Sequence, residues 1–151
     1  MRARAALLLA LLLVTAAAGC GSKQDNGDYV KALNHAQTGL AERFRALQSR
    51  ITPTSSAKQD QKTLTAYEGA VRTAVADLKA VDPPSGFAAL HGRFIAQVAG
   101  YGTALRTARG QLGGDDPQAI LAAQGRLRTA VARTGTQLDA TIQAINQKLK
   151  G

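Results

Sequence analysis

The stretch that decides the fold runs from residue 87 to residue 112 and reads FAALHGRFIAQVAGYGTALRTARGQL. Its apolar side chains recur every three or four residues, which is the spacing of one face of an α-helix. The residues on that face are Phe87, Leu90, Phe94, Val98, Tyr101, Leu105, Ala108 and Leu112. A periodic run of this length predicts a long amphipathic helix.

The same period appears in three further segments of the chain. Ala has the highest helix propensity, and the β-branched and aromatic runs that are typical of strands are missing from all four segments, so the sequence predicts an all-α protein. The apolar positions of the other segments are Tyr29, Leu33, Leu40, Phe44, Leu47 and Ile51, then Leu64, Tyr67, Val71, Val75, Leu78 and Val81, and finally Ile120, Leu127, Val131, Leu138, Ile142, Ile145 and Leu149.

Short connections rich in Pro, Gly, Ser and Asp separate the four segments at residues 52–56, 82–86 and 113–117. Ser56 with Gln59 predicts a capping box, and Asp116 before Pro117 predicts an N-cap followed by proline in the first helical turn. Short connections make consecutive helices antiparallel neighbours. We therefore expect an up-down-up-down four-helix bundle over residues 28–151.

Glycine and aromatic residues suggest how this bundle packs. All six aromatic side chains fall on the apolar faces of the first three segments, which predicts that they fill the core. Gly100 and Gly102 flank Tyr101 in the middle of a helix, where each glycine costs about 1 kcal/mol relative to Ala. Close packing is the favoured explanation, ahead of a kink or a small cavity beside Tyr101.

Residues 1–19 have the three parts of a secretory signal. Arg2 and Arg4 are followed by an apolar run over 5–14 and by small residues up to Gly19. The apolar stretch 5–18 is shorter than the roughly 20 residues that a membrane-spanning helix needs. The sequence therefore predicts an N-terminal signal helix that is removed from the mature protein.

The sequence Ala17-Ala18-Gly19-Cys20 resembles the lipobox of bacterial lipoproteins, with Ala17 where the family usually has Leu. The resemblance implies that Cys20 is diacylated and becomes the lipid-bearing N-terminus at the extracytoplasmic face of the cell membrane. As the chain's single cysteine, Cys20 would otherwise be a free thiol in an exported protein. Residues 20–27 are then expected to form the lipidated cysteine and a flexible polar tether.

The segment Val81-Asp82-Pro83-Pro84-Ser85-Gly86-Phe87-Ala88-Ala89-Leu90-His91 resembles a Pro-Pro and Leu-His signature of uncharacterised small bacterial lipoproteins with helical bundles. This resemblance implies no activity. It would make His91 a recurring feature, whereas its position next to Leu90 also suits a half-buried histidine at the edge of the core.

Residues for catalysis or metal binding are sparse. His35 and His91 each stand alone on their helices, without the HxxxH or ExxH pairs of helical metal sites. The chain lacks a GxSxG elbow and a phosphate-binding glycine loop ending in Lys-Ser/Thr. We therefore expect no enzymatic activity, no metal and no cofactor.

The chain carries a formal net charge of +9, and Arg2 and Arg4 contribute to it only before the signal is removed. Residues 42–62 and 104–129 approximate the membrane-distal half of the bundle, with nine basic and four acidic residues. This excess predicts contact with an anionic envelope component, although a solvated charged face is the simpler interpretation. The candidate contact residues are Arg43, Arg45, Arg50, Arg106, Arg109, Arg126 and Arg128.

Two functions remain open on the sequence alone. The first is a membrane-anchored extracytoplasmic interaction or binding module, whose partner is an anionic envelope component or an envelope protein. The second is a helical bundle that carries a small ligand or a lipid in a cavity near Tyr101. Small side chains let helices approach to about 8 Å, which favours the first. Export disfavours nucleic acid as a partner.

Overall fold

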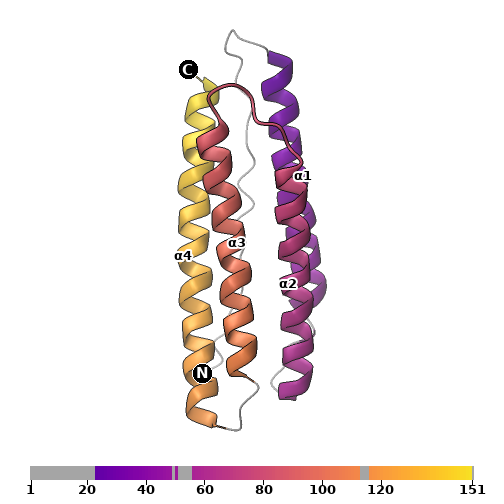
Figure 1. Cartoon of the computed structure of the whole chain (residues 1–151), viewed down its shortest axis with the longest axis vertical. Helices are drawn as coiled ribbons and strands as arrows, with labels where there is room; N and C mark the ends of the chain where they lie inside the picture. Colours follow the sequence, from indigo (N-terminus) through magenta and orange to yellow (C-terminus); the bar gives the residue numbers. More distant parts are fainter. Residues whose placement is uncertain (1–22, 49, 51–55, 113–115, 151) are drawn as a thin grey trace.

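The computed structural model describes residues 23–48, 50, 56–112 and 116–150, and every regular element among them is an α-helix. The chain runs up and down the bundle, so that consecutive helices are antiparallel (Figure 1). The predicted all-α class and up-down-up-down arrangement are therefore confirmed. The helices are α1 (Lys23–Gln48), α2 (Ala57–Lys79), α3 (Ala88–Gln111) and α4 (Pro117–Lys150).

At the N-termini of α2 and α4, the predicted capping residues Ser56 and Asp116 each accept a hydrogen bond from the first turn of the helix. The hydroxyl of Ser56 accepts a hydrogen bond from the backbone N–H of Gln59 at 3.3 Å. The carboxylate of Asp116 accepts one from the backbone N–H of Gln118 at 2.9 Å. Both bonds satisfy amide donors that the first turn of a helix leaves without partners.

The start of α1 differs from the expected tether. The helix begins at Lys23, so residues 23–27 of the segment expected to be flexible are helical. The predicted signal peptide over residues 1–19, the predicted lipidation residue Cys20 and the apolar residue Ile51 lie outside the described residues.

The turn between α2 and α3 depends on one glycine. Gly86 has a φ of 85°, a left-handed backbone conformation that residues other than glycine rarely adopt. Beyond it, the backbone N–H of Phe87 donates to the carbonyl of Pro84 at 2.9 Å. The ammonium group of Lys148, near the end of α4, lies 5.6 Å from the centre of the Phe87 ring. The turn is thereby joined to the last helix at the end drawn uppermost in Figure 1, which we call the upper end.

Two groups of rings hold α1, α2 and α3 together. At the upper end, the ring of Tyr29 lies 5.6 Å from the rings of both Phe87 and His91. In the lower half, the ring of Phe44 lies 4.7 Å from Tyr67 and 5.4 Å from Tyr101. All six predicted core aromatics therefore take part in the core, including Phe94, which is 2% exposed.

Helix α4 packs differently, because it has no aromatic side chain. Its large buried apolar residues, Ile142, Ile145 and Leu149, all lie in its last third. Nearer its start, Leu127 is only half-buried and Leu121 is 66% exposed. Helix α4 packs mainly against α3, so that α3 lies between α4 and α2.

Gly100 and Gly102 have different surroundings although they are two residues apart. A Cβ on Gly102 would lie 3.1 Å from Cγ1 of Val71, so this glycine allows α2 and α3 to approach closely. A Cβ on Gly100 would have nothing within 4 Å. The prediction of close packing is therefore confirmed at Gly102, whereas Gly100 is exposed.

This difference makes the two glycines a matched pair for mutation. We expect Gly100→Ala to raise the free energy of unfolding by about 1 kcal/mol, because alanine favours the helix and nothing opposes the added methyl group. Gly102→Ala should instead lower it, since crowding a packed core costs about 1–3 kcal/mol, and Val71 is buried. Urea unfolding followed by circular dichroism measures both changes. Equal stabilisation by the two substitutions would contradict the close approach at Gly102.

Candidate functional site

His91 is buried in the core, with 5% of its surface exposed, rather than half-buried at the core edge as predicted. Its Nε2 lies 3.0 Å from the carbonyl oxygen of Leu78, and its Nδ1 lies 3.3 Å from the hydroxyl of Tyr29. A carbonyl can only accept, so Nε2 carries the proton and donates it. In the neutral ring, Nδ1 then accepts from Tyr29.

The hydroxyl of Tyr29 is suited to the role of donor. Burial raises the pKa of Tyr29 to about 12, so the hydroxyl keeps its proton at neutral pH. Both ring nitrogens of His91 are thus occupied by bonds to α1 and α2. His91 acts as a structural link between three helices, and neither nitrogen is available for catalysis or for a metal.

This link predicts coupled effects on stability. His91→Leu leaves the Tyr29 hydroxyl buried without its partner, and Tyr29→Phe leaves Nδ1 of His91 without a donor. Each substitution should cost about 1–3 kcal/mol in the free energy of unfolding. The double variant should cost less than the sum, because the second substitution removes the group that the first left unpaired. Additive losses in a urea-unfolding cycle would contradict the hydrogen bond between the two side chains.

A second buried polar link joins α2 to α3. Glu68 on α2 is 4% exposed, and its Oε1 accepts from Nε of Arg109 at 2.7 Å. Its Oε2 lies 3.8 Å from Nε of Arg106. Two of the predicted contact residues, Arg106 and Arg109, therefore neutralise a buried carboxylate of their own bundle. Such partners offset the free-energy cost of burying a carboxylate.

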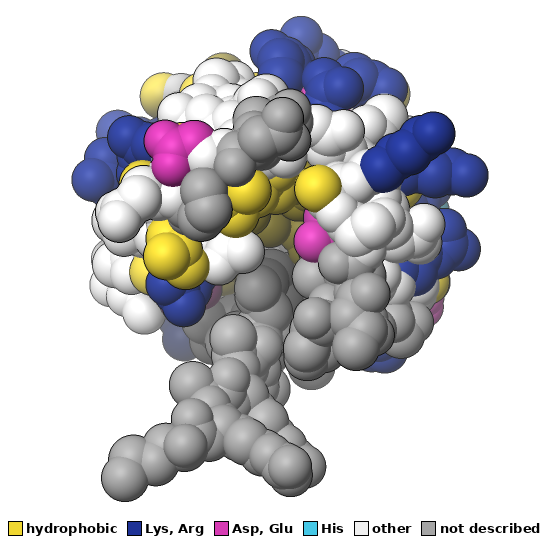
Figure 2. Space-filling view, turned by 90° about the horizontal axis from the view of Figure 1, so that it is seen from below, with side chains coloured by type: hydrophobic (Ala, Val, Ile, Leu, Met, Phe, Trp, Pro, Cys, Tyr) yellow, Lys and Arg dark blue, Asp and Glu magenta, His cyan; other side chains and the backbone are white. Residues whose placement is uncertain are grey.

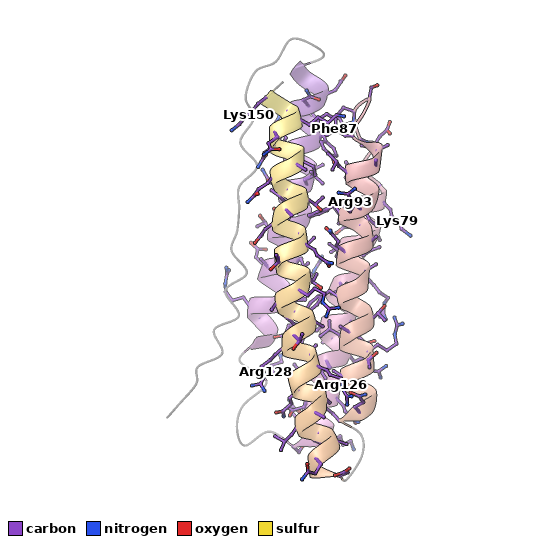
Figure 3. The ribbon with its side chains drawn as sticks, turned by 90° about the vertical axis from the view of Figure 1, so that its left-hand side faces the viewer. Lys79, Phe87, Arg93, Arg126, Arg128 and Lys150 are labelled. Atoms are coloured by element: carbon purple, nitrogen blue, oxygen red, sulfur yellow. The ribbon has the colours of Figure 1, made fainter. Side chains whose placement is uncertain are left out.

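The other predicted contact residues are spread around the bundle. Arg43 approaches Asp77 to 4.0 Å, and Arg45 is exposed on α1. Arg126 lies on the side of α4 nearer to α3, whereas Arg128 lies on the opposite side (Figure 3). Seen from the lower end, basic side chains form separate groups around an apolar centre (Figure 2). The structure therefore does not bring the seven arginines together as one patch.

The net positive charge differs more strongly between the two pairs of helices, α1 with α2 and α3 with α4, than between the two ends of the bundle. Helix α3 has three arginines and no acidic residue, and α4 has five basic residues against Asp139 alone. Helices α1 and α2 each have four basic and three acidic residues. The positive charge of the bundle is thus concentrated on the half formed by α3 and α4.

Two adjoining hollows lie on the surface between these two helices, with volumes of about 320 Å³ and 360 Å³. Gly100, Ala104 and Ala130 line both hollows, so the two hollows adjoin and together form a groove along the helices. Arg126 lines the lower hollow, and Arg93 and Arg133 line the upper one. We call this feature the α3–α4 groove and define it by Arg93, Gly100, Ala104, Arg126, Ala130 and Arg133.

Polar side chains complete the groove. Gln97 lines the upper hollow and accepts a hydrogen bond from the buried hydroxyl of Thr141 at 3.0 Å, which ties α4 to α3. Gln111 lines the lower hollow, and its buried Oε1 has no hydrogen-bond partner among the described residues. Arg93, Arg126 and Arg133 are exposed and form no ion pair with another described side chain.

Sequence reasoning missed Arg93 and Arg133. Both fall outside residues 42–62 and 104–129, because the charge was divided between the two ends of the bundle. A count by helix would have found them, since residues 86–114 contain three arginines and no acidic side chain.

Comparison with known proteins gives no further assignment, because no family model, curated protein or solved structure has significant similarity to the chain. None of the described helices is long and apolar enough to cross a membrane. Within the described ranges, His, Cys, Asp and Glu side chains form no group of three or more that could hold a metal ion.

Proposed function

We propose that the chain is a bacterial lipoprotein whose helical bundle binds an anionic component of the cell envelope through its α3–α4 half. The observation that supports this function is the segregation of charge by helix, with eight basic residues and one acidic residue on α3 and α4 together, of which Arg106 and Arg109 pair with Glu68 of α2. Arginines without acidic neighbours raise the local concentration of anions and favour their binding. The α3–α4 groove is lined by three such arginines, of which Arg93 and Arg133 share one hollow and Arg126 lines the other.

The alternative function, transport of a small ligand or lipid within the bundle, has less support. The residue expected beside a cavity, Tyr101, packs against Phe44 in the lower ring group. Burial raises the pKa of Tyr101 well above its usual value, and the charge of Tyr67 raises it further, so its hydroxyl stays neutral. The hollows of the α3–α4 groove instead lie on the surface and have arginines at their edges.

The anchoring part of the proposal rests on the sequence around Cys20. A thioether-linked diacylglyceryl group would hold α1 near the membrane, since that helix begins only three residues later, at Lys23. The bundle would then stand close to the bilayer, on a tether shorter than residues 20–27. The partner would have to reach the bundle within the envelope.

Substitution of the cysteine tests this anchoring. We expect Cys20→Ser to abolish lipid attachment, because serine offers no thiolate for transfer of the diacylglyceryl group. Mass spectrometry of the mature N-terminus and fractionation of the envelope measure the change. Wild-type protein that carries an unmodified cysteine, or that is cleaved after Ala18, would contradict the proposal.

Charge reversal tests the binding surface. The test variant combines Arg93→Glu, Arg126→Glu and Arg133→Glu, and the matched control combines Arg45→Glu, Arg72→Glu and Arg128→Glu. All six side chains are exposed, and the two variants have the same net charge. We expect the test variant to lose at least about tenfold in affinity for delipidated cell-wall material at low salt, equivalent to 1.4 kcal/mol. The control should lose much less.

Two controls accompany this experiment. Helicity should be unchanged in both variants by circular dichroism, because the substituted side chains lie outside the core. Retention of the wild-type chain should fall steeply as salt rises, as expected of contacts between exposed charges. If both variants lose affinity equally, or if neither variant changes retention, the three arginines are ordinary solvated surface residues and the proposed binding surface is wrong.

A further inference from the structure

We propose that the α3–α4 groove is a channel for an extended phosphate-bearing polyol chain, which lies along the two helices. This inference rests on the proposed function and deepens it, since it names the chemical class of the anionic partner. It also replaces the predicted contact surface at the lower end of the bundle with a groove along its side.

The shape of the groove requires an elongated occupant. Its two hollows adjoin at Gly100, Ala104 and Ala130, which line both. Arg126 and Arg133 are seven residues apart on α4, which places their backbones about 10.5 Å apart along the helix axis at 1.5 Å per residue. Arg93 lines the same hollow as Arg133 from the opposite helix. A single ligand that meets all three arginines must therefore extend along the bundle.

The chemistry of the groove favours phosphate. Its three arginines form no ion pair with another described side chain, and the described residues that line the two hollows include no acidic side chain. A guanidinium group binds phosphate oxygens through two parallel hydrogen bonds. Because Gly100, Ala104 and Ala130 are small, a ligand backbone can come close to the helices.

A buried acceptor without a partner favours a ligand that also donates hydrogen bonds. The buried Oε1 of Gln111 lies at the lower hollow without a partner among the described side chains. A buried acceptor without a donor costs free energy, and a ligand hydroxyl would supply that donor. A polyol phosphate carries both hydroxyl groups and anionic oxygens, and so matches the arginines and the amide together.

Two other occupants fit the groove less well. A second copy of the chain would bring another basic α3–α4 face against this one, and like charges would repel. A flat anionic bilayer would contact the ridges of α3 and α4 and leave the floor between them empty. A substitution that fills the space between the two helices should therefore block a chain that lies in the groove, but should not block a membrane that contacts only the ridges.

The decisive variant is Gly100→Leu in the full-length chain, purified in neutral detergent. A Cβ on Gly100 has nothing within 4 Å, so the leucine can occupy the groove without disturbing the core. Gly92→Leu is the matched control, because Gly92 is also an exposed glycine of α3 with open space around its Cβ, and it does not line the groove. Circular dichroism checks that both variants remain helical.

The binding probe is fluorescently labelled poly(glycerol phosphate), measured by anisotropy. We expect Gly100→Leu to weaken its binding by at least about tenfold, or 1.4 kcal/mol, while Gly92→Leu leaves it unchanged. Polyglutamate of equal charge, and phosphatidylglycerol in mixed micelles, should compete poorly with the labelled probe. Poor competition would support recognition of the phosphate-bearing polyol chain itself.

Other results would overturn the inference in distinguishable ways. If Gly100→Leu binds normally while the Arg93, Arg126 and Arg133 reversal does not, the ligand contacts the three arginines without entering the space between the helices, and only the proposed function survives. If neither variant weakens binding, both the inference and the proposed function fail. If polyglutamate binds as tightly and is equally blocked by Gly100→Leu, the groove recognises anionic chains in general and the phosphate assignment is wrong.

Discussion

The absence of aromatic side chains from α4 is the constraint on which the rest of the structure depends. Rings bury large areas and join α1, α2 and α3 through Tyr29, Phe44 and their neighbours. Helix α4 has only aliphatic and small side chains with which to pack, and its large buried residues are confined to its last third. Small residues such as Ala104 and Ala130 then line the outer boundary of α3 with α4, where a groove remains.

Helix α3 forms a fixed wall for that groove. On its side towards α2, Gly102 packs under Val71, Glu68 binds two arginines, and His91 is bonded to both α1 and α2. Arg106 and Arg109 of α3 neutralise Glu68, whereas Arg93 forms no ion pair with another described side chain. The same helix therefore presents a packed, charge-compensated side to α2 and an uncompensated basic side to the groove.

The spacing of apolar residues was sufficient to predict the four helices, and the short connections predicted their antiparallel order. The capping residues predicted where α2 and α4 begin. Rotation of each helix about its own axis was harder to infer, because alanine-rich faces differ little in hydropathy from one side to the next. Arg126 and Arg128 are neighbours in the sequence and were grouped together, yet they lie on opposite sides of α4. His91 was placed at the core edge because nothing in the sequence reveals that Tyr29 and the Leu78 carbonyl satisfy its ring.

The two glycines beside Tyr101 look alike in the sequence, but they have different roles because they face different sides of α3. Residues two apart on an α-helix point about 200° away from each other, so one glycine of the pair meets α2 and the other meets the groove. Gly102 is explained by the close approach of α2 and α3, because a Cβ there would lie 3.1 Å from Cγ1 of Val71. Packing does not explain Gly100, which has open space around it and costs helix stability. Gly92 of the same helix also has open space around its Cβ position, so Gly100 is distinguished by lining both hollows of the groove, where a glycine lets a bound chain come close to the helix.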